Sequence, residues 1–234
     1  MSLQFEKEEF LSRVYMNIVN AADFEEMVEK CPSVLKGDMA LVPRLLLGDR
    51  TSSYFNGPSA LVTNEMVLEL EMSIDDFQER AMTNSKEMFP GRIVDVVKES
   101  GLSDSDDFML FDNIAVPAVY AVTNSIHDGG MAAVFYDPDT LDNLASMKEK
   151  DIIVFPVDGS AAFCVEFNGS EQFEEMQSDY AEICAEMKER GENVLSDKIL
   201  HYDRASRTLT TTEGEELSLG AEPEYHAVNR HFGR

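Results

Sequence analysis

The sequence predicts an α+β fold, in which helices and a mainly antiparallel sheet come from different stretches of the chain. Three observations lead to this class. Apolar residues recur every three or four positions in much of residues 1–101, which is the period of an amphipathic helix. Beyond residue 108, short β-rich runs alternate with helical stretches. Hydrophobic residues make up 44% of the 234 residues, enough for a packed core.

Helical patterns dominate the start of the chain. Residues 4–22 carry apolar side chains three and four positions apart, which predicts an amphipathic helix. Asp23 and Glu26 have the spacing of a capping box, which predicts a second, short helix through about Lys30. Residues 1–101 are therefore expected to form a mostly helical N-terminal half.

Two further helices are expected in the middle of this half. Asn64 is a candidate N-cap for a helix over residues 65–71, and Ser73 with Asp76 has the pattern of another helix start. A strand over residues 60–72 stays open as an alternative, because so short an apolar run fits either period.

Proline and glycine mark two other elements of this half. "MALVPRLLLG" (39–48) is an apolar run interrupted by Pro43, which predicts an edge strand because proline has no N–H to donate. "RIVDVVKES" (92–100) predicts a helix that ends at Gly101.

Residues 108–212 are expected to form a C-terminal half with the order β-β-α-β-β-α-β-β. We expect a mainly antiparallel sheet with helices packed on one face. The strands are expected at 114–124, 131–136, 151–156 and 161–167 and in a hairpin of "KILHYD" and "TLTTT", and the helices at 139–149 and 171–190. The loop "LSDSDDF" (102–108) separates the halves, and 213–234 is expected to be an acidic, loosely ordered tail; one continuous domain is the alternative.

The stretch "TNSIHDGGMAAVFYDP" (123–138) brings chemistry-bearing residues together in the sequence. His127, Asp128 and Tyr136 are its candidate catalytic residues, because imidazole and carboxylate groups exchange protons readily. A phosphate-binding loop leads its glycines into a helix, whereas here a predicted strand follows them. We therefore interpret the segment as a hairpin bend and assign no catalytic residue; an enzyme of unknown class with a site at this hairpin stays an alternative.

Other polar residues carry no recognisable chemical signature. His226 and His231 are five positions apart, which is not the spacing that brings two imidazoles together on a helix. "SDSDD" (103–107) lacks the central glycine and distal Glu of a calcium loop, and Ser160 in "DGSAA" is not in a G-x-S-x-G turn. Cys31, Cys164 and Cys184 have no metal-binding spacing. The sequence thus predicts no metal and no cofactor.

The net charge of −26 limits the classes of partner. Proteins that bind nucleic acid or anionic membranes need a basic surface, so neither contact is expected. A negative surface suits a protein partner, a basic one in particular. A decoy that imitates DNA, as anti-restriction factors do, is the narrower alternative.

The expected compartment is the cytoplasm. No apolar run approaches the roughly 20 residues of a membrane helix. "MSLQFEKEEF" lacks the basic and apolar regions of a signal peptide. Three cysteines do not make a disulfide framework, which also indicates a reducing compartment.

Three segments occur in an order that we recognise: "VTNEMVLELEMSIDDFQERAMTN" (62–84), "VPAVYAVTNSIHDGGMAAVFYDPDTLDNLASMKEKDIIVFP" (116–156) and "ENVLSDKILHYDRASRTLT" (192–210). Together they resemble a bacterial family of unknown function, found in gut bacteria and often on mobile genetic elements. The resemblance covers most of the chain. It implies a shared fold and a bacterial, cytoplasmic setting, and it implies no reaction.

One departure from this family bears on chemistry. After the strand that ends in Pro156, the resemblance implies a polar turn of the type Ser-Ser-x-His-Glu, whereas this chain has "VDGSA" (157–161). An activity carried by that turn in relatives is therefore not expected here. We predict a binding or accessory protein that acts through contacts with other proteins, and not an enzyme.

Overall fold

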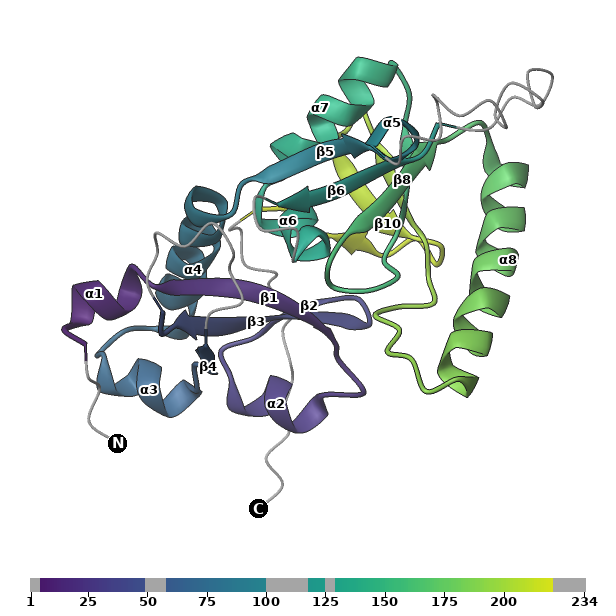
Figure 1. Ribbon diagram of the computed structural model, residues 1–234. Helices are drawn as coiled ribbons and strands as arrows, with labels where there is room; N and C mark the ends of the chain where they lie inside the picture. The colour runs from purple at the N-terminus through teal and green to yellow at the C-terminus, as the bar shows by residue number, and fades with distance from the viewer. Residues whose placement is uncertain (1–4, 49–57, 100–117, 125–128, 221–234) are drawn as a thin grey trace.

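The computed structural model describes residues 5–48, 58–99, 118–124 and 129–220, which form two antiparallel sheets with helices around them (Figure 1). The first sheet has the order β1-β3-β2, and β4 also pairs with β3. Its strands are β1 (Val14–Asn20), β2 (Val34–Lys36), β3 (Met39–Leu46) and β4 (Ser59–Leu61). The combination of helices and antiparallel strands confirms the α+β class.

The second sheet has the order β11-β10-β9-β7-β8-β6-β5, and its neighbouring strands are all antiparallel. Its strands are β5 (Gly91–Asp95), β6 (Tyr120–Asn124), β7 (Ile152–Phe155), β8 (Ala162–Glu166), β9 (Leu200–Asp203), β10 (Thr208–Thr211) and β11 (Glu216–Leu217). The predicted strand pair at 151–156 and 161–167 and the hairpin of "KILHYD" with "TLTTT" are confirmed.

The helices in the described part of the chain are α1 (Lys7–Leu11), α2 (Glu25–Lys30), α3 (Asn64–Glu69), α4 (Ile74–Met88), α5 (Val96–Glu99), α6 (Gly130–Tyr136), α7 (Asp139–Lys148) and α8 (Ser170–Glu189). None of these described helices has the length and apolar composition needed to span a bilayer. The helices expected at 139–149 and 171–190 are confirmed as α7 and α8.

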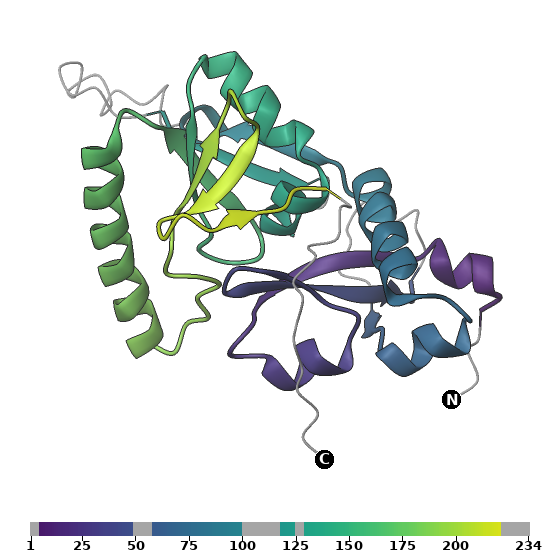
Figure 2. The ribbon, with the colours of Figure 1, turned by 180° about the vertical axis from the view of Figure 1, so that it is seen from behind.

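Helices cover both faces of the second sheet, as Figures 1 and 2 show from opposite sides. Ile152 and Val154 of β7 pack in the core that contains α6 and α7, whereas Ile153 packs in a separate core with Tyr180 and Cys184 of α8. The expectation of helices on one face is therefore wrong. Consecutive buried residues in β7, without alternation, are typical of a strand covered on both sides.

The two sheets are joined by shared core and by hydrogen bonds. The largest hydrophobic core contains side chains from both sheets, such as Leu41 and Leu209. Ser196 Oγ also donates to Asp38 Oδ2 at 2.8 Å, between the segment after α8 and the turn before β3. Because β5 is the edge strand of the second sheet, residues 102–108 do not divide the sheets; that loop lies outside the described residues.

The prediction of a mostly helical N-terminal half is wrong, because it contains the first sheet and β5. The helix expected over residues 4–22 is the short α1 followed by β1. Val14, Met16 and Ile18 alternate with less buried neighbours, and β1 pairs with β3 along its whole length. Apolar residues four positions apart, such as Val14 and Ile18, fit one face of a strand as well as one face of a helix. The pairing of β1 with β3 therefore decides the conformation.

Pro43 lies in a central strand, contrary to the expected edge position. β3 pairs with β1 on one side and with β2 and β4 on the other. The Pro43 carbonyl accepts from Val62 N at 3.1 Å, so the polar atoms of Pro43 face the β2/β4 side. The registers of β2 and β4 leave Val42 and Pro43 between them, and there the missing N–H of proline costs no ladder hydrogen bond.

The helix starts of α2, α3 and α4 test the predicted caps. Ser73 caps α4 as predicted, accepting from Asp76 N at 3.1 Å. The N-cap of α3 is Thr63, one residue before the predicted Asn64, and the alternative strand is limited to β4. The predicted capping box of α2 is wrong, since Phe24 occupies the N-cap position and no side chain caps this helix.

The prediction of one helix over residues 92–100 is wrong. Their first part is β5, which pairs with β6 from Gly91↔Asn124 to Asp95↔Tyr120, and only Val96–Glu99 is helical. Ile93 and Val94 are β-branched, which suits a pleated sheet edge as well as it suits a helix stripe.

The first part of the expected tail, residues 213–220, is ordered against the rest of the molecule. Leu217 of β11 is buried, and Gly220 N donates to Phe135 O at 2.7 Å. The fully buried Lys36 donates to Ser218 O at 2.7 Å and lies over the Phe135 ring. The description of this part as loosely ordered is wrong, and residues 221–234 lie outside the described residues.

Candidate functional site

Residues 131–136 form a buried helix and not the predicted strand. Every residue of α6 is buried, and the helix contacts β6, α4 and β1. Periodicity cannot distinguish helix from strand in a short run that is apolar throughout, so burial on all sides decided. The hairpin interpretation of 123–138 is therefore wrong. The segment consists of β6, a connection outside the described residues, and α6.

The two glycines at the start of α6, Gly129 and Gly130, allow the helix to touch the sheet. Gly129 is the N-cap and has φ 86°, in the left-handed region that glycine adopts readily. A Cβ on Gly130 would lie 2.3 Å from Val122 O and 2.6 Å from Thr123 Cα. Gly130 N donates to Ser160 O at 2.8 Å. Glycines do precede a helix here, as in a phosphate-binding loop, but their close approach is to protein backbone.

Tyr136, the third candidate catalytic residue, is part of the core. Its side chain is buried, and its hydroxyl donates to Phe89 O at 2.8 Å. Burial raises the pKa of Tyr136 far above its ordinary value, so the phenol stays neutral and acts as a hydrogen-bond donor. His127 and Asp128 lie outside the described residues. The structure thus gives Tyr136 a role in joining α6 to the end of α4.

Asp137, which follows α6, makes a second link to the same place. Its Oδ2 accepts from Gly91 N at 3.0 Å, and its Oδ1 lies 3.1 Å from Lys86 Nζ. Asp137 is two residues before α7, but its side chain does not cap that helix. This nearly buried carboxylate instead fixes the start of β5 against α4.

A charged network continues from Asp137 across the outside of α7. Lys86 Nζ lies 2.6 Å from Asp139 Oδ2, and the hydrogen bond from Lys86 lowers the pKa of Asp139. Arg207, in the turn of the β9–β10 hairpin, lies 2.7 Å from Asp142 Oδ2. The network joins α4, α7 and the hairpin. Its two cations, Lys86 and Arg207, pair with three carboxylates, so it has the properties of a structural clamp.

The remaining polar candidates are separate from one another. His201 lies 3.4 Å from Asp151 and against the Phe167 ring, on the α8 side of the second sheet. His226 and His231 lie outside the described residues, as does the 103–107 run. Within the described residues, no group of three or more His, Cys, Asp or Glu side chains could hold a metal ion.

The cysteines and Ser160 have structural surroundings. All three cysteines are buried, and burial raises the pKa of Cys164 to about 12, which keeps the thiol protonated. Ser160 Oγ donates to Asp158 Oδ1 at 2.6 Å inside the "VDGSA" turn. This turn lies beside the start of α6, through the Ser160–Gly130 hydrogen bond.

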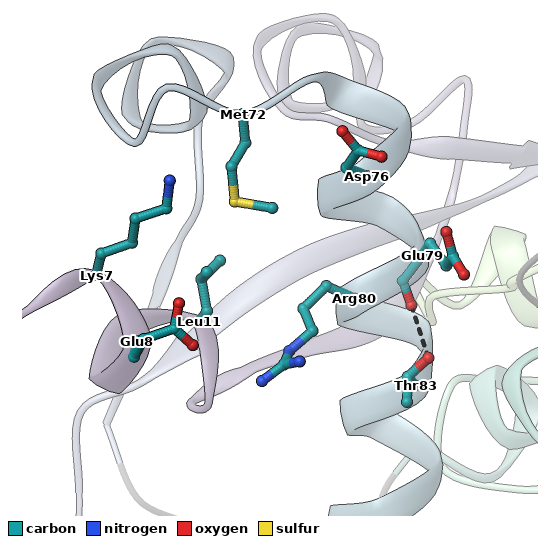
Figure 3. A pocket seen from close by; sticks show the side chains of 8 residues that line it. All are labelled: Lys7, Glu8, Leu11, Met72, Asp76, Glu79, Arg80 and Thr83. Carbon is teal, nitrogen blue, oxygen red and sulfur yellow. Dashed lines mark hydrogen bonds between the residues drawn. The ribbon is translucent and has the colours of Figure 1, made fainter.

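The described surface also has a groove between α1 and α4 that the sequence did not indicate (Figure 3). Its volume is about 430 Å³, and its lining residues are Lys7, Glu8, Leu11, Met72, Asp76, Glu79, Arg80 and Thr83. Figure 3 shows Arg80 extending from α4 toward Leu11 and Glu8 of α1. No motif carries these residues, because the groove forms only when α1 packs beside α4.

Comparison with known proteins identifies one related family. No curated protein matches the chain, and no solved structure matches it. A family model described as a family of unknown function (DUF5688) matches residues 2–204. This range includes the 123–138 segment, α8 and the α1–α4 groove. The chain belongs to this family of unknown function, DUF5688.

Proposed function

We propose that the chain is a binding protein that docks a basic protein partner on the exposed face of α8. The observation that carries this proposal is Ile183, whose side chain is 54% exposed in the middle of an acidic helix. Exposed apolar side chains with a charged surround are typical of the centre of a protein–protein interface.

The acidic residues around Ile183 form a row along the helix. They are spaced three or four positions apart and all are exposed: Glu171, Glu175, Asp179, Glu182, Glu186 and Glu189. At 3.6 residues per turn this spacing keeps them on one side, over about 27 Å of helix. Asp179 and Glu186 are four before and three after Ile183, so they lie on either side of it.

The opposite side of α8 is held firmly. Tyr180 and Cys184 are buried, and the Tyr180 hydroxyl donates to Ser196 O at 3.0 Å. The Gln177 side chain donates to Asp197 O and accepts from Ile199 N, both at 2.8 Å. A docking helix fixed in this way loses little conformational entropy when a partner binds.

Charge alone does not single out α8. Exposed acids also occur on α1, α2, α3 and α4, so the negative surface extends over several sides of the molecule. This distribution weighs against the DNA-imitating decoy, which needs its charge gathered on one surface. The combination of an exposed Ile183 with the long row of acids beside it, and not the total charge, is our reason for proposing the contact on α8.

A pull-down with matched variants tests the proposal. One variant carries Ile183→Ser, and its control carries Leu68→Ser at another exposed apolar residue, which is 69% exposed on α3. A second variant neutralises four acids of the row, Glu175→Gln, Asp179→Asn, Glu182→Gln and Glu186→Gln. Its control neutralises four exposed acids of α2 and α3, Glu25→Gln, Glu29→Gln, Glu65→Gln and Glu69→Gln, with the same change in net charge.

We expect a basic protein that is recovered with the parent chain and both controls, and lost with both α8 variants. Its recovery should also fall as salt rises, because the row and the partner attract through screened charges. Equal recovery with all variants contradicts the proposal. Equal loss with the two charge variants also contradicts it, because binding would then depend on net charge and not on α8.

A further inference from the structure

We propose that the groove between α1 and α4 binds an apolar α-amino acid in its zwitterionic form. The groove lies at the other end of the molecule from α8 (Figure 1), so this inference is independent of the proposed partner. Its volume of about 430 Å³ is within the range of small-molecule sites, about 300–1,000 Å³.

Two of the five charged residues that line the groove, Arg80 and Glu8, have opposite signs and come from opposite walls. Arg80 extends from α4, and Glu8 extends from α1 on the other side of Leu11 (Figure 3). Within the described residues, neither side chain makes an ion pair or a hydrogen bond to another side chain, although Arg13 and Glu9 nearby pair at 3.0 Å. A carboxylate fits the forked guanidinium of Arg80, and an ammonium group fits the carboxylate of Glu8.

The floor between these charges is apolar. Leu11 is 4% exposed, and Met72, half-buried, extends into the groove from the connection between α3 and α4 (Figure 3). An aliphatic side chain of a bound amino acid would lie against Leu11 and cover the exposed part of Met72, which removes that part from water. Met72 has three rotatable bonds and adapts to side chains of different shape.

Lys7, Asp76 and Thr83 of the groove already make hydrogen bonds with their side chains, so Arg80 and Glu8 are the charged groups that we assign to a ligand. Lys7 Nζ donates to Leu70 O, which ties α1 to the end of α3. Asp76 accepts from Ser73 Oγ at 2.6 Å. Glu79 points away from α1 in Figure 3.

The walls of the groove are also fixed relative to each other. Asn84 of α4 is buried, and its Nδ2 donates to Leu11 O and to Val14 O, the residues at either end of the α1–β1 connection. A site whose walls are held before binding requires little reorganisation to accept a ligand.

Titration of the full chain with leucine and three fragments tests each feature separately. Isocaproate lacks the ammonium group, isoamylamine lacks the carboxylate, and glycine lacks the aliphatic side chain. Calorimetry or ligand-observed NMR should show saturable binding of leucine with Kd below about 1 mM. Each fragment should bind at least about tenfold more weakly, because each loses one of the three contacts.

Two variants then test which residue contacts the carboxylate of leucine and which contacts its ammonium group. Arg80→Gln should weaken leucine at least about tenfold and leave isoamylamine unchanged, and Glu8→Gln should weaken leucine and leave isocaproate unchanged. Arg92→Gln is the control, because Arg92 is an exposed arginine of β5 whose side chain likewise has no partner among the described residues.

Absence of saturable leucine binding at millimolar concentration overturns the inference. So does unchanged leucine affinity in Arg80→Gln, or binding of glycine as strong as that of leucine. All three variants change exposed side chains, so their far-UV circular dichroism should match the parent chain. The α8 variants leave this groove intact, so a failure here and a failure of the proposed partner contact are distinguishable.

Discussion

Two helices on opposite faces of the second sheet, α6 and α8, use their residues in opposite ways. All seven residues of α6 are buried. Only Tyr180 and Cys184 are buried among the twenty of α8. The helix within the segment that carries the candidate catalytic residues, α6 in 123–138, is thus the more deeply buried of the two. The acidic helix α8 is the one exposed to solvent.

This difference separates residues that build the fold from residues that are available to a partner. The Asp-Gly-Gly and Tyr-Asp-Pro sequences around α6 include Gly130, Tyr136 and Asp137, whose contacts join α6, β6, β5 and α4. The row of acids on α8 makes no comparable contact with the core. Three substitutions test this comparison, and a fourth tests the link between the two sheets at Asp38; they are given from the largest expected effect to the smallest.

Gly130→Ala should lower the free energy of unfolding by about 4 kcal/mol, because its Cβ would overlap backbone atoms that cannot move aside. Gly159→Ala is the control, since the nearest atoms to its Cβ, in Ile18, are 3.7 Å away. Denaturant unfolding measures both. A loss below about 1 kcal/mol for Gly130→Ala would show that α6 does not lie against β6 as described.

Tyr180→Ala should cost about 3 kcal/mol, because it removes a buried ring and the hydrogen bond to Ser196 O. Ile183→Ala, one turn further along the exposed side of the same helix, should change stability by less than about 0.5 kcal/mol. Thermal and denaturant unfolding of the two variants compare the faces of α8. Equal costs would contradict the division of α8 into a packed and a free face.

Tyr136→Phe should cost about 1–2 kcal/mol, because it removes the hydrogen bond from the Tyr136 hydroxyl to Phe89 O inside the core. Tyr202→Phe is the control, since its hydroxyl makes a long contact of 3.4 Å to Asp142 and otherwise interacts with the exposed side chain of Arg207. Denaturant midpoints measure the difference. An unchanged stability for Tyr136→Phe would remove the structural reason for a buried phenol and return Tyr136 to the candidate catalytic residues.

Asp38→Asn should have the smallest effect, and the effect should depend on pH. Burial raises the pKa of Asp38 above its ordinary value of 3.8, because the charged form is poorly solvated. The unfolded chain therefore loses this proton first, and the parent chain loses stability as pH rises through that window. The amide of the variant does not titrate, so the variant should gain stability relative to the parent over the range of pH above 3.8. Unfolding curves across this range measure the difference; a gap that stays constant with pH would contradict it.

Much of the second sheet was predictable, because its signals are local. "DIIVFP" and "AAFCVEF" are β-rich runs separated by a turn, and the 171–190 helix has a clear apolar stripe. The first sheet was missed, because the period of Val14, Met16 and Ile18 overlaps a helix pattern and β3 decides between them. The position of Pro43 in a central strand was not predictable for the same reason. It depends on the gap that β2 and β4 leave beside β3, which is visible only in the structure.

Less of the candidate site was predictable. The glycine, tyrosine and aspartate residues around α6 stand out in the sequence because apolar residues surround them. In the structure they are buried and make contacts that hold the fold together. Arg80 and Glu8 lie 72 positions apart and meet only through the packing of α1 beside α4. Ile183 continues the apolar spacing of Met176, Tyr180 and Met187 in the sequence, so its exposure on α8 follows only from the packing of the helix.

Amide hydrogen exchange tests the central comparison most directly, because one experiment measures both helices. The amides of α6, such as Ala133 N, which donates to Gly129 O at 3.1 Å, should exchange only through global unfolding. The amides of α8 should exchange through smaller openings with a lower free energy. If α6 exchanges as easily as α8, the 123–138 segment is not the structural centre of the molecule.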